Sequence, residues 1–332
     1  MKNNLFFKFS IIFVLFVISF VFSMISGVGD ISISMVFKSL FTNIDDNTHI
    51  IINQIRFPRF LLAVVAGAGL STSGCVFQGI LRNPLADPFT LGISGGSAFG
   101  ASVAFIFGLT AISWIFLPLA AFAGALIAIF FVYILNIKKG FDSSSMILSG
   151  VVASYIFSSG VMLIFAISSS DKLFSAFMWL MGNLSSFDER LLTPVSIAIV
   201  LGIIILCFFG NVINVITLGE QKASSLGINT ARTVKYIFLL SSLITASAVS
   251  CCGVIGFVGL MMPHIMRRFV GNDHRVLIPA SALAGAIFLP ICDTLSRLMF
   301  SPVELPVGVI TSIVGGIFFI ILLIKPGRKF SL

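Results

Sequence analysis

The chain has 332 residues, of which 58% are hydrophobic and only 10% are charged. Soluble domains carry about 25% charged residues, so this composition excludes a soluble globular protein and indicates an integral membrane protein. The formal net charge of +8 does not indicate nucleic-acid binding, because the basic residues gather in loops on one side of the predicted membrane.

Apolar runs recur along the whole chain at about the 20-residue length that a membrane-spanning helix needs, whereas barrel strands need only about ten residues. We therefore predict an all-α integral membrane protein that forms a single transmembrane domain over residues 1–332. The first run is interpreted as an uncleaved span because it is long and lacks a clear small-x-small cleavage site. The ten predicted spans cover approximately residues 5–25, 57–80, 89–109, 113–136, 144–168, 191–214, 233–251, 254–270, 277–297 and 306–324.

An eleventh apolar segment, at 172–182, is too short to be a span. A helix rises about 1.5 Å per residue, and the hydrocarbon core is about 30 Å thick. We predict a helix that lies at the membrane surface, with Trp179 at the interface where amphipathic rings are favoured.

The charge distribution predicts the orientation. With the N-terminus inside, the inner loops hold 14 of the 20 Lys and Arg residues and 4 of the 12 Asp and Glu residues, so the inner side carries +10 and the outer side −2. This asymmetry agrees with the positive-inside rule. An odd number of spans would place Lys325, Arg328 and Lys329 outside. We therefore expect a multi-pass protein of the cytoplasmic membrane with both termini in the cytoplasm.

A polar segment at 218–232, LGEQKASSLGINTAR, separates two predicted spans. Gly219 breaks the preceding helix, Glu220 suits the positive end of a helix dipole, and Gly227 is a C-terminal stop. These signals predict a short helix, with Ala223 and Leu226 three residues apart on one face that forms a shallow apolar surface. Two interpretations stay open: a plain loop, or a knob that docks a soluble partner.

The motifs of common enzymes are absent. The sequence contains no G-x-x-x-x-G-K-[ST], H-E-x-x-H or G-x-S-x-G, so we expect no ATP site of the usual kind and no enzyme activity. We predict no catalytic residue, no metal site and no cofactor. His264 is interpreted as a helix-end residue and the five cysteines as buried small hydrophobic residues. Few charges fall deep in the spans, whereas ion-coupled carriers usually place charges along the ion pathway. This pattern indicates that any transport is driven by an energy source outside this chain.

Small residues are dense in several spans, and most of them are expected to allow close helix packing. Gly150, Ser154 and Ser158 of the fifth span recur at steps of four and form one mildly polar stripe. This stripe is the candidate lining of a translocation path.

Three arginines are predicted on the outer side. Arg56 and Arg59 flank Pro58 at the start of the second span, and Arg297 follows Asp293 by one turn near the end of the ninth. One interpretation is interfacial anchoring together with an i,i+4 ion pair between Asp293 and Arg297. The other is a basic contact point for an acidic surface outside the membrane.

Distinctive motifs are spread over nearly the whole chain: RFPR (56–59), the Gly67/Gly69/Ser73-Gly74 run, QGILRNPLADP (78–88), LGISGG (91–96), WLMGNL (179–184), LGEQKASSLG (218–227), GVIGFVGLMMPHIMRRFVGNDHR (253–275), PASALAGA (279–286) and ELPVGVIT (304–311). With these motifs the chain resembles the permease subunits of ABC importers for iron–siderophore complexes, haem and cobalamin, over nearly its whole length. One departure is Gly315-Gly316-Ile317, where the family often has Gly-x-Pro.

The resemblance implies a type II ABC importer permease fold with ten transmembrane helices per subunit. It implies two copies, a homodimer, with the fifth span of each beside the translocation path, and two cytoplasmic ABC ATPases on the inner face. Gly219, Glu220, Ala223, Leu226 and Gly227 match the family's ATPase-coupling loop.

On the outer side, the resemblance implies an extracytoplasmic substrate-binding protein whose acidic residues pair with Arg56, Arg59 and Arg297. The partners are thus proteins and membrane lipid, with no nucleic acid. A ferric siderophore is the expected cargo, with haem and cobalamin as alternatives. An ion-coupled secondary transporter and an intramembrane enzyme that uses His264 or Asp293 are the alternatives from other classes.

Overall fold

The computed structural model describes residues 2–27, 31–41, 47–168, 170–185, 188–301 and 303–324. Every regular element in these ranges is a helix, which confirms the predicted all-α class. The predicted C-terminal cluster of Lys325, Arg328 and Lys329 lies outside the described residues.

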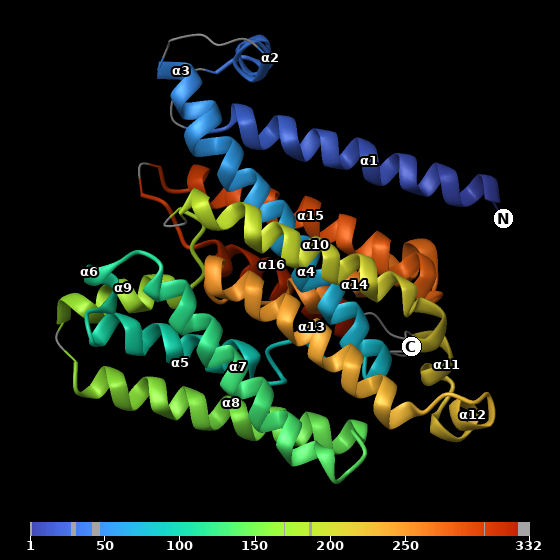
Figure 1. The fold of residues 1–332 in the computed structure, drawn as a ribbon. Helices are drawn as coiled ribbons and strands as arrows, with labels where there is room; N and C mark the ends of the chain where they lie inside the picture. The colour runs from blue at the N-terminus through green and yellow to red at the C-terminus, as the bar shows by residue number, and fades with distance from the viewer. Residues whose placement is uncertain are drawn as a thin grey trace.

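The helices follow one another along the chain with short connections (Figure 1). Those of the first half are α1 (Lys2–Ile25), α2 (Ile33–Phe41), α3 (Asn47–Ile50), the π-helical η1 (Ile51–Arg56), α4 (Phe57–Ile80), α5 (Ile93–Ile106), α6 (Leu109–Ile112), α7 (Phe116–Ile137) and α8 (Ser143–Ala166). Those of the second half are α9 (Ser170–Leu180), the 3₁₀ turn η2 (Glu189–Leu191), α10 (Leu192–Phe208), α11 (Gly210–Thr217), α12 (Glu220–Ser225), α13 (Thr230–Cys252), α14 (Val258–Val270), α15 (His274–Leu298) and α16 (Val307–Ile324).

Within the described ranges, eight helical stretches are long and apolar enough to cross a membrane, so the predicted ten spans are not confirmed. The two predicted spans without such a stretch correspond to α5, which has 14 residues, and α14, which has 13. Irregular backbone at 81–92 and 253–257 takes the place of their first turns. Leu91 and Ile255 within these segments are buried, and non-helical backbone at membrane depth is tolerated where protein surrounds it.

A further difference concerns the predicted single span at 191–214. The structure divides this region at Phe209, where α10 ends and α11 begins. Gly210 lies at this junction and packs directly against the backbone of Arg275, since a Cβ at Gly210 would meet the Arg275 nitrogen at 3.0 Å. The break therefore brings the α11 segment against the start of α15.

Helix α4 is the centre of the bundle, with α10, α13, α14 and α15 packed around it (Figure 1). The close approach of α4 to α15 depends on glycine, because a Cβ at Gly67 would lie 2.2 Å from the carbonyl oxygen of Gly285. A Cβ at Gly74 would similarly lie 1.9 Å from the Gly259 oxygen of α14. Side chains at these positions would push the helices apart, so the expectation that most small residues serve packing is confirmed here.

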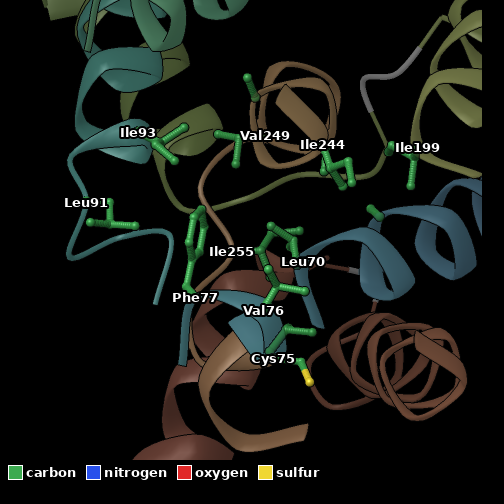
Figure 2. Close-up of a cluster of buried hydrophobic side chains, with 14 of the residues drawn as sticks. Leu70, Cys75, Val76, Phe77, Leu91, Ile93, Ile199, Ile244, Val249 and Ile255 are labelled. Carbon is green, nitrogen blue, oxygen red and sulfur yellow. The ribbon is translucent and has the colours of Figure 1, made fainter. Parts of the chain in front are cut away.

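The apolar core gathers around α4 from segments far apart in the sequence. Figure 2 shows Phe77 of α4 beside Leu91 and Ile255 of the two irregular segments, while Ile199 and Ile244 lie on the other side of Leu70. Cys75 is part of the same cluster, and the free cysteines Cys75, Cys251, Cys252 and Cys292 are buried, as predicted. Cys207 is half-buried.

Helices α5, α7, α8 and α9 form a second layer beside this core (Figure 1). The predicted short helix is present as α9, of 11 residues. Trp179, however, is only 4% exposed and packs with Ala101 of α5 and Ala121 of α7, so the prediction that it lies at an interface with lipid was wrong. The ring is large enough to fill the space that the small side chains of α5 and α7 leave.

The bundle has two distinct ends. Helix α12 lies at the end where α1 begins, and α2 and α3 lie at the opposite end (Figure 1). Because α4 starts next to α3 and runs through the centre, its first residues belong to the end opposite α12.

Candidate functional site

The polar segment at 218–232 folds into the predicted short helix. Gly219 precedes α12 with φ +109°, and Gly227 follows it with φ +80°, values that favour glycine at both positions. The turn closes through the Ile228 N–H, which donates to the Ala223 carbonyl at 3.0 Å. The next helix begins at once, because the Asn229 side chain accepts from the Arg232 N–H at 3.0 Å and caps α13. The result is a small, capped protrusion (Figure 1).

The apolar surface of this protrusion differs from the predicted one. Ala223 is fully buried, whereas Leu226 is 65% exposed, so the two residues do not form one exposed face. Leu218, which the sequence did not single out, is 59% exposed. The exposed apolar residues therefore lie at the two ends of α12, and Ala223 attaches the helix to the protein.

The base of the protrusion contacts other loops at the same end. A cavity of 110 Å³ is lined by Glu220 together with Arg82 of the 81–92 segment and Lys139 and Asp142 of the α7–α8 connection. Residues of both charges thus line one small cavity between α12 and two other connections. A displacement of α12 would change the shape of this cavity, which the segment that leads into α5 also lines.

At the opposite end, an ion-pair network brings the start of α4 against the end of α15. Asp293 is buried and accepts from Nε and Nη2 of Arg59 at 3.0 and 2.8 Å. Nε of Arg297 lies 3.4 Å from the other Asp293 oxygen, so the predicted i,i+4 ion pair is confirmed. Nη1 of Arg59 donates to Glu304 at 2.8 Å. One carboxylate therefore holds two guanidinium groups, and a second carboxylate completes the network.

Arg56 has a different environment. The side chain is 4% exposed, and its Nη1 donates to the carbonyl oxygens of Met24 and Ile25, at 2.6 and 3.1 Å, at the end of α1. Arg56, Arg59, Arg297 and Glu304 nevertheless line one cavity of 270 Å³ at this end. The structure thus brings the three predicted arginines together, largely buried and around an opening.

The stripe on α8 is divided in the structure. Gly150 packs against the Thr90–Leu91 backbone, where a Cβ would lie 2.4 Å from the Thr90 oxygen, and the Ser154 hydroxyl donates to the Phe89 carbonyl at 3.2 Å. Ser158 is exposed. Two of the three residues therefore hold the 81–92 segment in place, and the third remains on the surface of α8.

A larger cavity, of 610 Å³, lies beside this segment and was not predicted. Its walls come from α14, α16, the end of α9 and the two irregular segments, and are mostly apolar. Asp87 lines it and is 6% exposed. The only sequence signal was an acid between Pro84 and Pro88 in an apolar context.

Comparison with known proteins agrees with this geometry. The model of the FecCD transport family matches residues 15–325. The chain belongs to the FecCD transport family. With the relatives described next, this makes the FecCD-family chain a membrane-embedded ABC-transporter permease, as the resemblance implied.

Individual relatives of the FecCD-family chain differ in what their names say they carry. The cobalamin import system permease protein BtuC of Halobacterium salinarum is 40% identical over 84% of this chain and 75% of its own length. The Fe(3+)-citrate import system permease protein YfmE of Bacillus subtilis is 38% identical over 96% of each chain. Among solved structures, an inward-facing conformation of a putative metal-chelate type ABC transporter matches with a TM-score of 0.83 and 31% identity, covering 98% of this chain and 99% of that one.

Proposed function

We propose that this FecCD-family permease is the membrane subunit of an ATP-driven importer that moves a ferric-siderophore complex into the cytoplasm. The observation that supports this proposal most directly is the placement of two candidate contact sites at opposite ends of one bundle: α12 at one and the arginine network at the other. An importer driven by soluble ATPases and supplied by a soluble binding protein needs one contact on each side of the membrane.

In this proposal the segment with Gly219, Glu220, Ala223, Leu226 and Gly227 docks into a cleft of the ATPase. Leu226, which is 65% exposed, gives the partner an apolar anchor, while buried Ala223 transmits its movement. A capped helix is suited to this role because it moves as one body. The small cavity at its base is also lined by Arg82 and Lys139, and Arg82 belongs to the 81–92 segment that leads into α5.

Arg56, Arg59 and Arg297 form the proposed docking site for acidic residues of a substrate-binding protein. These arginines are largely buried, and their burial lowers the entropic cost of docking, because side chains that are held in place lose little conformational freedom when a partner binds. Charge complementarity at such a site sets register and speeds encounter more than it adds affinity. The 270 Å³ cavity gives a partner's carboxylate access to these groups.

Other parts of the proposal concern assembly and the path. The proposed subunit has ten membrane crossings, with α5 and α14 each counted together with its irregular segment. Both termini lie in the cytoplasm, and two copies form a homodimer that binds two ATPases. The path lies between the two copies and includes the α8 surface with Gly150, Ser154 and Ser158. Tyr155 and Met162 of α8 are 73% and 72% exposed, which supports a second copy, lipid or cargo against this face.

The substrate is proposed as a ferric siderophore, with haem or cobalamin as alternatives within the same importer type. Uptake of radioactive ferric siderophore, haem and labelled cobalamin by cells that depend on this permease distinguishes the three. Uptake should stop when the lysine of the ATPase phosphate-binding loop is replaced. Uptake that persists and follows the proton gradient would instead favour an ion-coupled carrier, with Asp87 as its first candidate group.

A further inference from the structure

The Arg59 guanidinium divides its hydrogen bonds between two different kinds of acid. Nε and Nη2 bind Asp293, whose side chain is 2% exposed, while Nη1 binds Glu304, whose side chain is 46% exposed. The first contact has two hydrogen bonds and lies inside the protein, and the second has one and faces outward. The two acids therefore hold Arg59 with different strength.

Glu304 is placed where an incoming group would arrive. It lies in the connection between α15 and α16 and lines the same 270 Å³ cavity as Arg56, Arg59 and Arg297. Its neighbour Leu305 donates to the Ser296 carbonyl at 3.2 Å, which fixes the backbone beside it. Within the described residues, the Glu304 carboxylate has no other ion-pair or hydrogen-bond partner than Arg59.

We propose that Glu304 occupies the position of a partner's carboxylate, and that a docking protein displaces it by presenting an Asp or Glu side chain to Nη1 of Arg59. The inference rests on the proposed docking function and adds an internal competitor to it. Asp293 is the positioning residue, because it keeps the guanidinium in place while the outer acid is exchanged. One carboxylate replaces another, so the exchange is close to neutral in energy and stays reversible.

This arrangement also favours specific docking. A protein without a correctly placed carboxylate leaves Glu304 on Arg59 and gains nothing from the arginine. Removal of the competitor should tighten docking by about twofold to fivefold, which corresponds to about 0.4–1 kcal/mol and lies within the range for exposed ion pairs. The binding protein then meets a guanidinium that already has the required orientation.

The test uses the full-length permease in nanodiscs and, as probe, the importer's substrate-binding protein, with the dissociation constant measured at constant ionic strength. Glu304→Gln should tighten docking about twofold to fivefold. Glu189→Gln is the matched control, because it removes the same charge from an exposed residue on the same predicted side. Arg59→Lys keeps the positive charge beside Asp293 but cannot bridge two acids, so Glu304→Gln should have no effect in that background.

Each outcome decides one point. The role of Glu304 as a competitor is supported if Glu304→Gln tightens docking, Glu189→Gln does not, and the tightening is lost in the Arg59→Lys background. An equal effect of both Glu→Gln changes, or tightening that persists with Lys at position 59, overturns it, since general repulsion would then explain the gain. If neither the original protein nor any variant binds the probe, the docking proposal itself fails. Thermal unfolding of each variant confirms that docking is measured on folded protein.

Discussion

The protrusion around α12 and the arginine network around Asp293 both present charge at an end of the bundle, but they are built differently. The protrusion comes from one continuous stretch, with glycines at positive φ before and after a single short helix. The network joins Arg59 and Asp293, which are 234 residues apart in the sequence. Glu220 and Leu226 are exposed, whereas the Asp293 and Arg297 side chains are 2% and 9% exposed. Substitutions should therefore affect mainly contact with partners at the first end, whereas those of buried residues at the second end should also affect folding.

The largest effect is expected at Asp293. Asp293→Asn would leave Arg59 and Arg297 buried without their shared counter-charge, and losing one member of a buried pair destabilises by about 3–5 kcal/mol. Glu304→Gln, which removes the exposed partner of the same arginine, should change stability by less than about 1 kcal/mol. Thermal unfolding in matched detergent compares the two. Equal loss from both would show that burial does not distinguish the two acids.

Asp87 can be compared with Asp293, because it is also a buried acid but has no cationic partner in the described residues. Burial of a carboxyl without a counter-charge costs free energy, because the group loses its contact with water. Asp87→Asn keeps the size of the side chain and removes this acid, so it should stabilise the protein by about 1–3 kcal/mol in thermal unfolding.

Thermal unfolding of both forms in matched detergent measures this difference. Asn136 is a buried amide in α7 that donates to Ser149, so Asn136→Ala provides a control that should destabilise the protein. A loss of stability in Asp87→Asn would contradict this interpretation of Asp87.

At the protrusion, Glu220→Arg should affect coupling and leave the fold intact. Transport per ATP hydrolysed is expected to fall about tenfold, within the usual range of coupling energies between sites. Membrane insertion and thermal stability should stay unchanged because the residue is exposed. Uptake and ATP hydrolysis by the reconstituted importer are measured together, with Lys222→Glu as a second charge reversal in the same helix. Normal coupling in the Glu220 variant would remove the proposed role of α12.

The smallest expected effect concerns Gly227, which has φ +80° and open space around it. Gly227→Ala meets no atom but strains the backbone by about 1–2 kcal/mol, which should loosen the end of α12 locally. Gly316→Ala is the matched control, since that site is equally open and has no positive φ. Hydrogen exchange of residues 220–228 should increase only in the first variant. Equal exchange in both would show that this turn does not depend on glycine.

Much of the fold followed from local signals. Apolar runs predicted the long helices, and the glycines at 219 and 227 predicted where α12 begins and ends. The Asp293–Arg297 spacing predicted their ion pair. The placement of Trp179 and Ala223 inside the protein was missed, because burial depends on which distant helix covers a residue.

The shortening of α5 and α14 was missed for a related reason. The predicted spans included 89–92 and 254–257, which are mostly apolar, so hydropathy does not distinguish a helix from irregular backbone there. Only surrounding protein makes such backbone tolerable at membrane depth.

The sequence by itself determined the membrane class, the family and the position of the exposed helix, because each depends on composition or on residues within a few turns of one another. The tertiary structure alone decided that Arg59 meets Asp293 and Glu304, and that Asp87 lines a cavity. These features depend on packing between segments far apart in the chain, and the energy of a charge is set by what packing places around it.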